Sequence, residues 1–243
     1  VLDSPFIVHL LGFTRTPLLS IITEHFDTSL HDLLPPEETP EWPPITDLLI
    51  AFQITKAVCH MHSRGVFHLN LKPSNILIQQ TDNQGMFRVK VSDFGLSSLS
   101  SEVRRIESTP KFMSPEAIES MRSNESFSAS KCDVYGLGLL FFCLSKMNAT
   151  PGWKNPSPLD NLLPSKSKKG MRWNGLITSC CDPDPEKRPS AKEVERILAK
   201  MIRGLGLLDE KRLQEFSLNR PSPSQSSTQL STSFRLPWTE IDP

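Results

Sequence analysis

The sequence has no excess of charge of either sign, because 27 lysine and arginine residues balance 27 aspartate and glutamate residues. A dedicated nucleic-acid binder usually carries a basic surface, so this balance argues against that class. No apolar run approaches the roughly 20 residues that a membrane span requires. Cysteine is sparse and odd in number, five in 243 residues, which argues against a disulfide scaffold and fits a reducing compartment.

Glycine is also scarce, with 11 residues against 21 prolines, and the hydrophobic content of 37% is modest. We therefore expect part of the chain to lie outside any core. The chain begins at Val1 and lacks the charged and then apolar leader that is typical of a signal peptide. We expect a cytoplasmic protein, and we interpret the sequence as a piece of a longer chain.

The hydrophobic pattern predicts strands and helices in one mixed fold. Prolines and polar runs separate these segments, and Ser92 to Glu116 reads as irregular. Lys166, Lys168 and Lys169 read as a solvated loop. The predicted elements are strands at Phe6 to Phe13, Leu18 to Thr23 and Phe87 to Val91, a helical turn at Leu30 to Leu34, and helices from Thr46-Asp47 (as the cap) to Gly65, from Cys132 to Met147 and from Ser190 to Ile202, the last with Val194, Ile197, Leu198 and Met201 on one face.

Five short motifs follow one another along the chain. Each tripeptide alone is weak, because chance produces it easily, but the order and the spacing together are specific. The motifs are His68-Leu69-Asn70-Leu71-Lys72-Pro73-Ser74-Asn75, Asp93-Phe94-Gly95, Ser114-Pro115-Glu116, Asp133-Val134-Tyr135-Gly136-Leu137-Gly138 and Arg188-Pro189-Ser190.

This series resembles the C-terminal lobe of a eukaryotic protein kinase, whose catalytic loop reads H-R-D-x-K-x-x-N and is followed by D-F-G and A-P-E. Lys72 and Thr109 resemble the Ser/Thr type of that family. The resemblance implies an α+β, two-lobed, kinase-like fold, represented mostly by the helical lobe. It divides the chain into a remnant of the small lobe (1–26), the large lobe (27–208) and a Ser/Pro-rich tail that we expect to be mostly disordered (209–243).

The resemblance also implies a nucleotide site. Thr23 would stand at the back of the adenine pocket, Glu24 and Phe26 would belong to the hinge whose backbone pairs with adenine, and Leu77 would pack under the base. Phosphoryl transfer requires metal and phosphate clamps rather than covalent chemistry. Asp93 and Asn75 would accordingly hold Mg²⁺, and Lys72 would lie near the γ-phosphate.

Other matching positions imply structural roles. His68 and Phe94, together with Leu10, would stack between the lobes. Glu116 and Arg188 would form a buried ion pair. Asp133 would accept backbone N–H groups from the His68–Asn75 loop.

Two positions depart from the family pattern. Asn70 stands where the family has the aspartate that takes the proton of the substrate hydroxyl, and a carboxamide cannot act as that base. General-base contributions are about 10²–10⁴-fold in rate. Leu69 replaces the arginine that usually pairs with a phosphorylated activation segment, so switching by that route is not expected.

Three hypotheses follow. We favour a pseudokinase-like signalling or scaffolding module with weakened or absent phosphotransfer. The second is an active ATP-dependent Ser/Thr kinase whose small lobe is missing from the sequence, and the third is a helical interaction domain without nucleotide binding. ATP and Mg²⁺ are the expected cofactors if the nucleotide site is complete. Proteins are the expected partners or substrates, without nucleic acid and without a membrane span.

Overall fold

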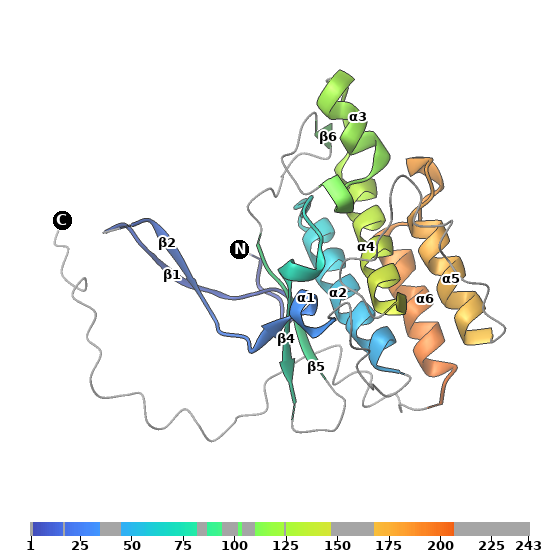
Figure 1. Cartoon of the computed structure of the whole chain (residues 1–243), viewed down its shortest axis with the longest axis horizontal. Helices are drawn as coiled ribbons and strands as arrows, with labels where there is room; N and C mark the ends of the chain where they lie inside the picture. The colour runs from blue at the N-terminus through green and yellow to red at the C-terminus, as the bar shows by residue number, and fades with distance from the viewer. Residues whose placement is uncertain are drawn as a thin grey trace.

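The computed structural model describes residues 2–16, 18–34, 45–81, 87–93, 102–103, 110–123, 125–146 and 168–206. Phe94, Thr109 and the predicted tail lie outside these ranges. In Figure 1, the long helices lie side by side next to a small sheet, and a hairpin projects away from the other side of that sheet. Within the described part, no helix is both long and apolar enough to cross a bilayer.

The small sheet has three antiparallel strands in the order β3 (Thr28–Ser29), β4 (Ile76–Gln80) and β5 (Phe87–Val91). The bounds of β5 are those that its alternating pattern predicts. Gln53 of the neighbouring helix satisfies backbone groups of β5, because its Nε2 donates to Phe87 O at 2.9 Å and its Oε1 accepts from Val89 N at 3.1 Å. The sheet is thereby joined to the helical body.

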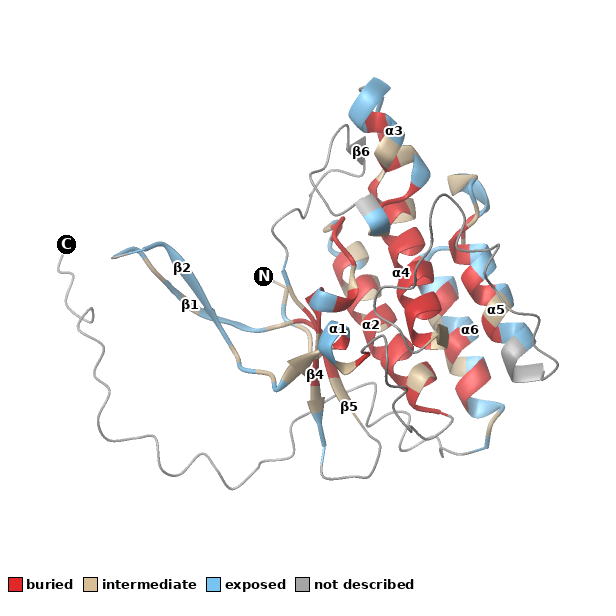
Figure 2. Ribbon diagram, in the orientation of Figure 1, coloured by how far each residue is buried: buried red, intermediate tan, exposed pale blue. Residues whose placement is uncertain are grey.

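The helical body is built around α2 (Thr46–Ser63) and α4 (Ala129–Lys146), which Figure 2 shows largely in the colour of buried residues. All five apolar residues that spacing predicts for the inner face of α2 are buried: Leu49, Phe52, Ile54, Val58 and Met61. The predicted cap is wrong, because the N-cap residue is Ile45 and makes no side-chain hydrogen bond. Asp47 nevertheless accepts from Leu48 N at 2.9 Å in the first turn, and burial of the inner face supplies most of the stability of this helix.

Helix α6 (Ala191–Arg203) begins as predicted, at a capping box in which Ser190 Oγ accepts from Glu193 N and the Glu193 carboxylate accepts from Ser190 N at 2.8 Å. Its inner residues Val194 and Leu198 are fully buried. Ile197 does not belong to that face, since 40% of it is exposed. A step of three residues from Val194 turns the helix by only about 300°, which leaves Ile197 at the edge of the inner face, whereas the step of four places Leu198 within it.

Three expectations about local structure are wrong. Lys168 lies in helix α5 (Lys168–Cys180) rather than in a loop. The stretch from Ser92 to Glu116, which we expected to be irregular, contains the short strand β6 (Glu102–Val103) and the turn η2 (Pro110–Phe112). It ends in helix α3 (Pro115–Ser123). The first predicted strand begins later than expected, since only Ile7 forms an isolated bridge, to Val91. The remaining short elements are α1 (Leu30–Leu33), η1 (Pro73–Asn75), β7 (Phe127–Ser128), which pairs with β6, and η4 (Pro185–Lys187).

The projecting hairpin consists of β1 (Leu10–Thr14) and β2 (Ser20–Thr23), paired antiparallel with Phe13 opposite Ile21. Its apolar side chains are exposed, as the pale colour in Figure 2 shows. Exposed apolar side chains on a hairpin are typical of a segment that another segment or protein covers. The exposed residues are Leu10, Leu11, Phe13, Leu18, Leu19, Ile21 and Ile22.

A buried ion pair joins α3 to the segment before α6. Arg188 Nη1 and Nη2 lie 2.6 and 2.8 Å from the two carboxylate oxygens of Glu116, and none of the Arg188 side chain is exposed. Arg188 also donates to the carbonyls of Asp182 and Lys131, at 2.8 and 3.0 Å, and lies over the Tyr135 ring. Five donors in a fixed fork suit such a junction.

We predict that Glu116→Gln lowers the free energy of unfolding by about 3 kcal/mol, because it leaves the buried Arg188 charge without its counter-charge. Urea unfolding of the whole chain measures this change. The control is Glu119→Gln on the same helix, whose carboxylate is 61% exposed and lies 3.8 Å from Arg122. The control should change stability by less than about 0.5 kcal/mol, and equal effects of the two variants would contradict the prediction.

Candidate functional site

The loop that carries His68 to Asn75 is held by one carboxylate. Asp133, on α4, is 2% exposed, and its two oxygens accept from His68 N at 2.8 Å and from Leu69 N at 2.7 Å. The Nε2 atom of His62, at the end of α2, lies 2.8 Å from the same carboxylate. Three donors from two chain segments thus converge on Asp133, which holds the loop against the helical body.

Two residues of the site have left-handed backbone conformations, Leu69 with φ of 63° and Asp93 with φ of 60°. For residues other than glycine this region costs about 1–3 kcal/mol and persists only where surrounding contacts determine it. Leu69 is 4% exposed, and Asp133 binds its backbone N–H. The conformation of the loop is therefore imposed by the fold and is compatible with leucine at this position.

His68 connects the loop to the segment before Asp93. Its ring is fully buried, Nε2 donates to Ser92 O at 3.0 Å, and Nδ1 accepts from Asn70 N at 3.2 Å. Burial lowers the pKa of His68, and the nearby charge of Asp133 offsets this effect only in part. A neutral ring fits the hydrogen bonds, because one nitrogen must accept while the other donates.

Asn75 and Asp93 are brought together through Ser92. The carbonyl oxygen of Asn75 accepts from Ser92 N at 2.9 Å and from Ser92 Oγ at 3.2 Å, and Asp93 follows directly with an exposed side chain. Asn75 Nδ2 donates to Asn70 O at 2.8 Å, so Oδ1 is the atom of this amide that can coordinate a cation. One carboxylate and one amide oxygen, completed by phosphate oxygens and water, form a donor set that suits Mg²⁺.

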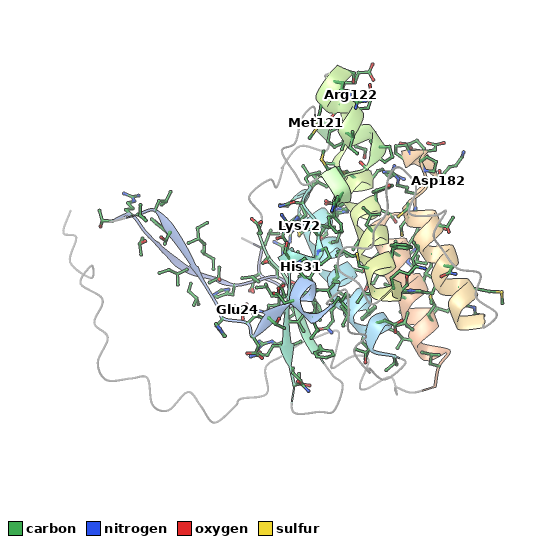
Figure 3. The ribbon with its side chains drawn as sticks, in the orientation of Figure 1. Glu24, His31, Lys72, Met121, Arg122 and Asp182 are labelled. Carbon is green, nitrogen blue, oxygen red and sulfur yellow. The ribbon has the colours of Figure 1, made fainter. Side chains whose placement is uncertain are left out.

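Asn70 and Lys72 occupy the middle of the same loop. Asn70 is 8% exposed, and its backbone N–H and C=O both bond within the site. Lys72 is half-buried and adopts an extended conformation before η1. Figure 3 labels Lys72 here and Glu24 beside the small sheet. The loop accordingly keeps its shape with a carboxamide at position 70.

The residues expected around a nucleotide base are linked to β5 by an unexpected ion pair. Glu24, just after β2, accepts from Lys90 Nζ and from His9 N, the latter at 2.7 Å. Lys90 is 6% exposed and lies opposite Leu77 in the sheet register. The Phe26 ring lies within 5.8 Å of Arg88 and 5.9 Å of Lys90. A cationic β5 therefore holds Glu24 and Phe26 in place.

The remaining predicted positions lie outside this loop. Thr23 ends β2 with an exposed side chain, and Leu10, expected in a stack with His68 and Phe94, is 57% exposed on the hairpin. Within the described residues Leu10 is therefore not part of a buried stack, and Phe94 lies outside them. Glu116 and Arg188 form the ion pair between α3 and the segment before α6, at a distance from this loop along the chain.

Two residues of the site were missed by sequence reasoning, His62 and Lys90. A lysine between Val89 and Val91, both fully buried, is a signal for a buried counter-charge. His62 had no comparable signal, because its partner Asp133 lies 71 residues away. Clusters of three or more His, Cys, Asp or Glu side chains suited to a metal are absent from the described residues.

A mostly helical body with a small antiparallel sheet, a loop held by a buried carboxylate and a second carboxylate two residues after β5 is the architecture of the large lobe of a protein-kinase-like fold. The chain belongs to the protein kinase family, since the model of the protein kinase domain matches residues 1–197. Its relatives are of the Ser/Thr type.

Three relatives illustrate this similarity. The chain is 29% identical over 204 residues to serine/threonine-protein kinase PkaA of Streptomyces coelicolor, covering 78% of this chain and 35% of PkaA. It is 29% identical over 218 residues to serine/threonine-protein kinase CTR1 of Arabidopsis thaliana, covering 83% and 25%. It is 32% identical over 158 residues to the ovarian-specific serine/threonine-protein kinase Lok of Drosophila melanogaster, covering 60% and 32%. The chain thus spans about a third or less of these three relatives.

The Glu24–Lys90 pair predicts a pH dependence of stability. Burial raises the pKa of Glu24, but the hydrogen bonds from Lys90 and the His9 N–H and the charges of Lys90 and Arg88 outweigh this and hold it below its ordinary value of 4.5. A lowered folded pKa stabilises the fold at pH above the ordinary value, and this stabilisation is lost as pH falls through the folded pKa.

We expect Lys90→Met to reduce this loss of stability between pH 5 and pH 3 relative to the unmodified chain, because the shift in Glu24 depends mainly on Lys90. Urea midpoints across this range measure it. Lys187→Met is the control, since its pair with Asp184 is exposed. If the two variants have the same pH dependence, Lys90 does not cause the shift.

Proposed function

We propose that this chain is a Ser/Thr-type protein kinase domain that binds nucleotide with Mg²⁺ but transfers phosphate weakly or not at all, and that it serves as a pseudokinase module in signalling or scaffolding. The observation that carries the proposal is Asn70. It lies in a loop with an ordered, hydrogen-bonded backbone, at the position where a base is needed, and its side chain is a carboxamide.

The proposed loss is one of proton acceptance. A carboxylate at position 70 could orient a substrate hydroxyl and take its proton as the phosphoryl group arrives, whereas the amide of Asn70 can only exchange hydrogen bonds with that hydroxyl. Missing general-base catalysis costs about 10²–10⁴-fold in rate, or roughly 3–5 kcal/mol of barrier. Nucleotide binding does not require this proton transfer.

Retained groups support the nucleotide part of the proposal. Asp93 and Asn75 would hold Mg²⁺, which supplies charge neutralisation between phosphate oxygens. Lys72 would place an ammonium near the terminal phosphate, and the backbone of Glu24 and Phe26 would face the base. Because the Glu24 N–H donates to His9 O at 3.1 Å, its carbonyl is the group left for adenine.

An active kinase is the second candidate, favoured by the same three retained residues, Lys72, Asn75 and Asp93. Positioning and electrostatic stabilisation account for most of phosphoryl-transfer catalysis. A chain that keeps both could retain a measurable rate without the base. The two candidates share nucleotide binding and differ in turnover, so binding and turnover are tested separately.

The first test is a thermal shift with Mg-ATP on the whole chain. At 100 times its dissociation constant, a ligand should stabilise the fold by about 2.7 kcal/mol. Asp93→Asn should abolish the shift while tolerating the left-handed backbone, which asparagine adopts more readily than most residues. Glu119→Gln, an exposed carboxylate elsewhere, should leave it unchanged. Absence of any shift in the unmodified chain would reject nucleotide binding and favour a helical interaction domain.

The second test restores the carboxylate. Asn70→Asp should raise phosphate incorporation into a Ser/Thr peptide library by about 100-fold or more. The double variant with Asp93→Asn should lose the gain, which ties it to the metal site. Strong labelling by the unmodified chain, lost with Asp93→Asn and not increased by Asn70→Asp, would replace the pseudokinase proposal with the active kinase.

A further inference from the structure

A cavity of about 460 Å³ lies away from the candidate nucleotide site, between the segment before β1, the second half of α2 and the first turn of α6. Its volume falls in the range of about 300–1,000 Å³ that is common for small-molecule sites. It shares no lining residue with the loop from His68 to Asn75 or with Asp93. The residues that matter are Pro5, Phe6, Lys56, Cys59, Lys192 and Glu195.

Two ammonium groups meet at one carboxylate in this cavity. Glu195 Oε1 lies 3.3 Å from Lys56 Nζ, and Glu195 Oε2 lies 2.6 Å from Lys192 Nζ. Burial raises the pKa of Glu195, but its hydrogen bonds and charge contacts with the two lysines outweigh this and lower it. Glu195 is therefore ionised near neutral pH, and two lysines beside one carboxylate give the cluster one net positive charge.

The arrangement of this cluster favours a second anion. Each lysine has three N–H donors, and Glu195 accepts one from each lysine. Glu195 also holds the two ammonium groups close together. The fold thereby offsets, before any ligand binds, the entropy cost of ordering the two lysines and part of the repulsion between their charges. An incoming carboxylate or phosphate that contacts both ammonium groups would complete an alternating set of charges without further rearrangement.

The rest of the wall is apolar or uncharged. Phe6 is 3% exposed, and burial together with Glu195 raises the pKa of the Cys59 thiol to about 12, so the thiol is neutral and a poor nucleophile. Burial and the nearby Arg64 lower the pKa of His60, which also lines the cavity, so its ring is neutral as well. The positive charge of the cavity therefore comes from the lysines, beside a surface suited to an apolar group.

We propose that this cavity is a binding site for a small organic anion, in which an apolar body rests against Phe6 and Cys59 and one carboxylate or phosphate group contacts Lys56 and Lys192. The two acidic groups share the chemistry that the cavity selects, namely negative charge and several acceptor oxygens on one end of a compact apolar molecule.

Three probes with one aromatic body test the proposal on the whole chain by ligand-observed NMR titration. They are 2-naphthoate, 2-naphthyl phosphate and the neutral 2-naphthalenemethanol. At least one anionic probe should bind about tenfold more tightly than the neutral probe. A preference for the phosphate or the carboxylate then identifies which acidic group the site takes, and either preference supports the proposal.

Matched lysine variants locate the binding. Lys56→Met and Lys192→Met should each weaken the anionic probe by about fivefold or more, and Lys192, with a side chain 61% exposed, can be replaced with little risk to folding. Lys72→Met, in the candidate nucleotide site, and Lys187→Met, on the surface, should leave the affinity unchanged.

Two results would overturn the proposal. Equal binding of the neutral and anionic probes, or no binding of any probe, would leave the cluster as an ion-pair contact between α2 and α6. Loss of binding in Lys72→Met with no loss in Lys56→Met and Lys192→Met would assign the anion to the nucleotide site instead.

Discussion

The carboxylate of Asp133 is the interaction on which the candidate site depends. It is nearly inaccessible to solvent and binds two successive backbone N–H groups, those of His68 and Leu69, together with the ring of His62. Buried carboxylates are stable when their oxygens are satisfied by donors, and here the donors belong to the loop that must be held. The same hydrogen bonds therefore stabilise the Asp133 charge and fix the conformation of the loop. The strained backbone of Leu69 persists because a relaxed conformation would take the Leu69 N–H away from the buried Asp133 carboxylate.

This arrangement separates the shape of the loop from its chemistry. The backbone of Asn70 is bound within the site, because its N–H donates to His68 Nδ1 and its C=O accepts from Asn75 Nδ2. Replacing aspartate by asparagine at such a position changes the proton affinity of one side chain while these backbone bonds remain. A chain can therefore keep the loop conformation that suits phosphate and metal binding and still lose the base. For this reason an ordered loop alone does not distinguish an active kinase from an inactive one.

Much of the fold was predictable wherever a hydrophobic period was continuous. The alternation in Phe87–Val91 located β5 to the residue, and the inner face of α2 followed from helical spacing. Helix α5 was missed because its first residues, Lys168 and Lys169, read as a polar loop. The signal was present further on, since the buried residues recur at helical spacing: Trp173, Leu176, Ile177 and Cys180.

The site was predictable to the extent that its residues are close together in sequence. Motif order placed His68, Asn75 and Asp93, whose backbone pairing through Ser92 the structure contains. The Glu24–Lys90 pair joins residues 66 positions apart, and no local pattern encodes such a distance. The sequence contains a lysine in a strand that is predicted to be buried. This pattern indicates that a counter-charge lies nearby but does not identify the residue that carries it. Long-range electrostatic pairs therefore have to be read from the fold.

Helix α2 contributes residues both to the candidate site and to the cavity beside α6. Lys56 and Cys59 line the cavity beside α6, while His62, at the end of the same helix, contacts Asp133. Between them the helix is fixed by fully buried residues such as Val58 and Met61. A packed helix has few intermediate positions, so an anion in the cavity could influence the loop only by binding two discrete arrangements of α2 with different affinity. With α2 anchored in the core along this length, the expected effect of such an anion is to stabilise the contact between α2 and α6 and leave the loop geometry unchanged.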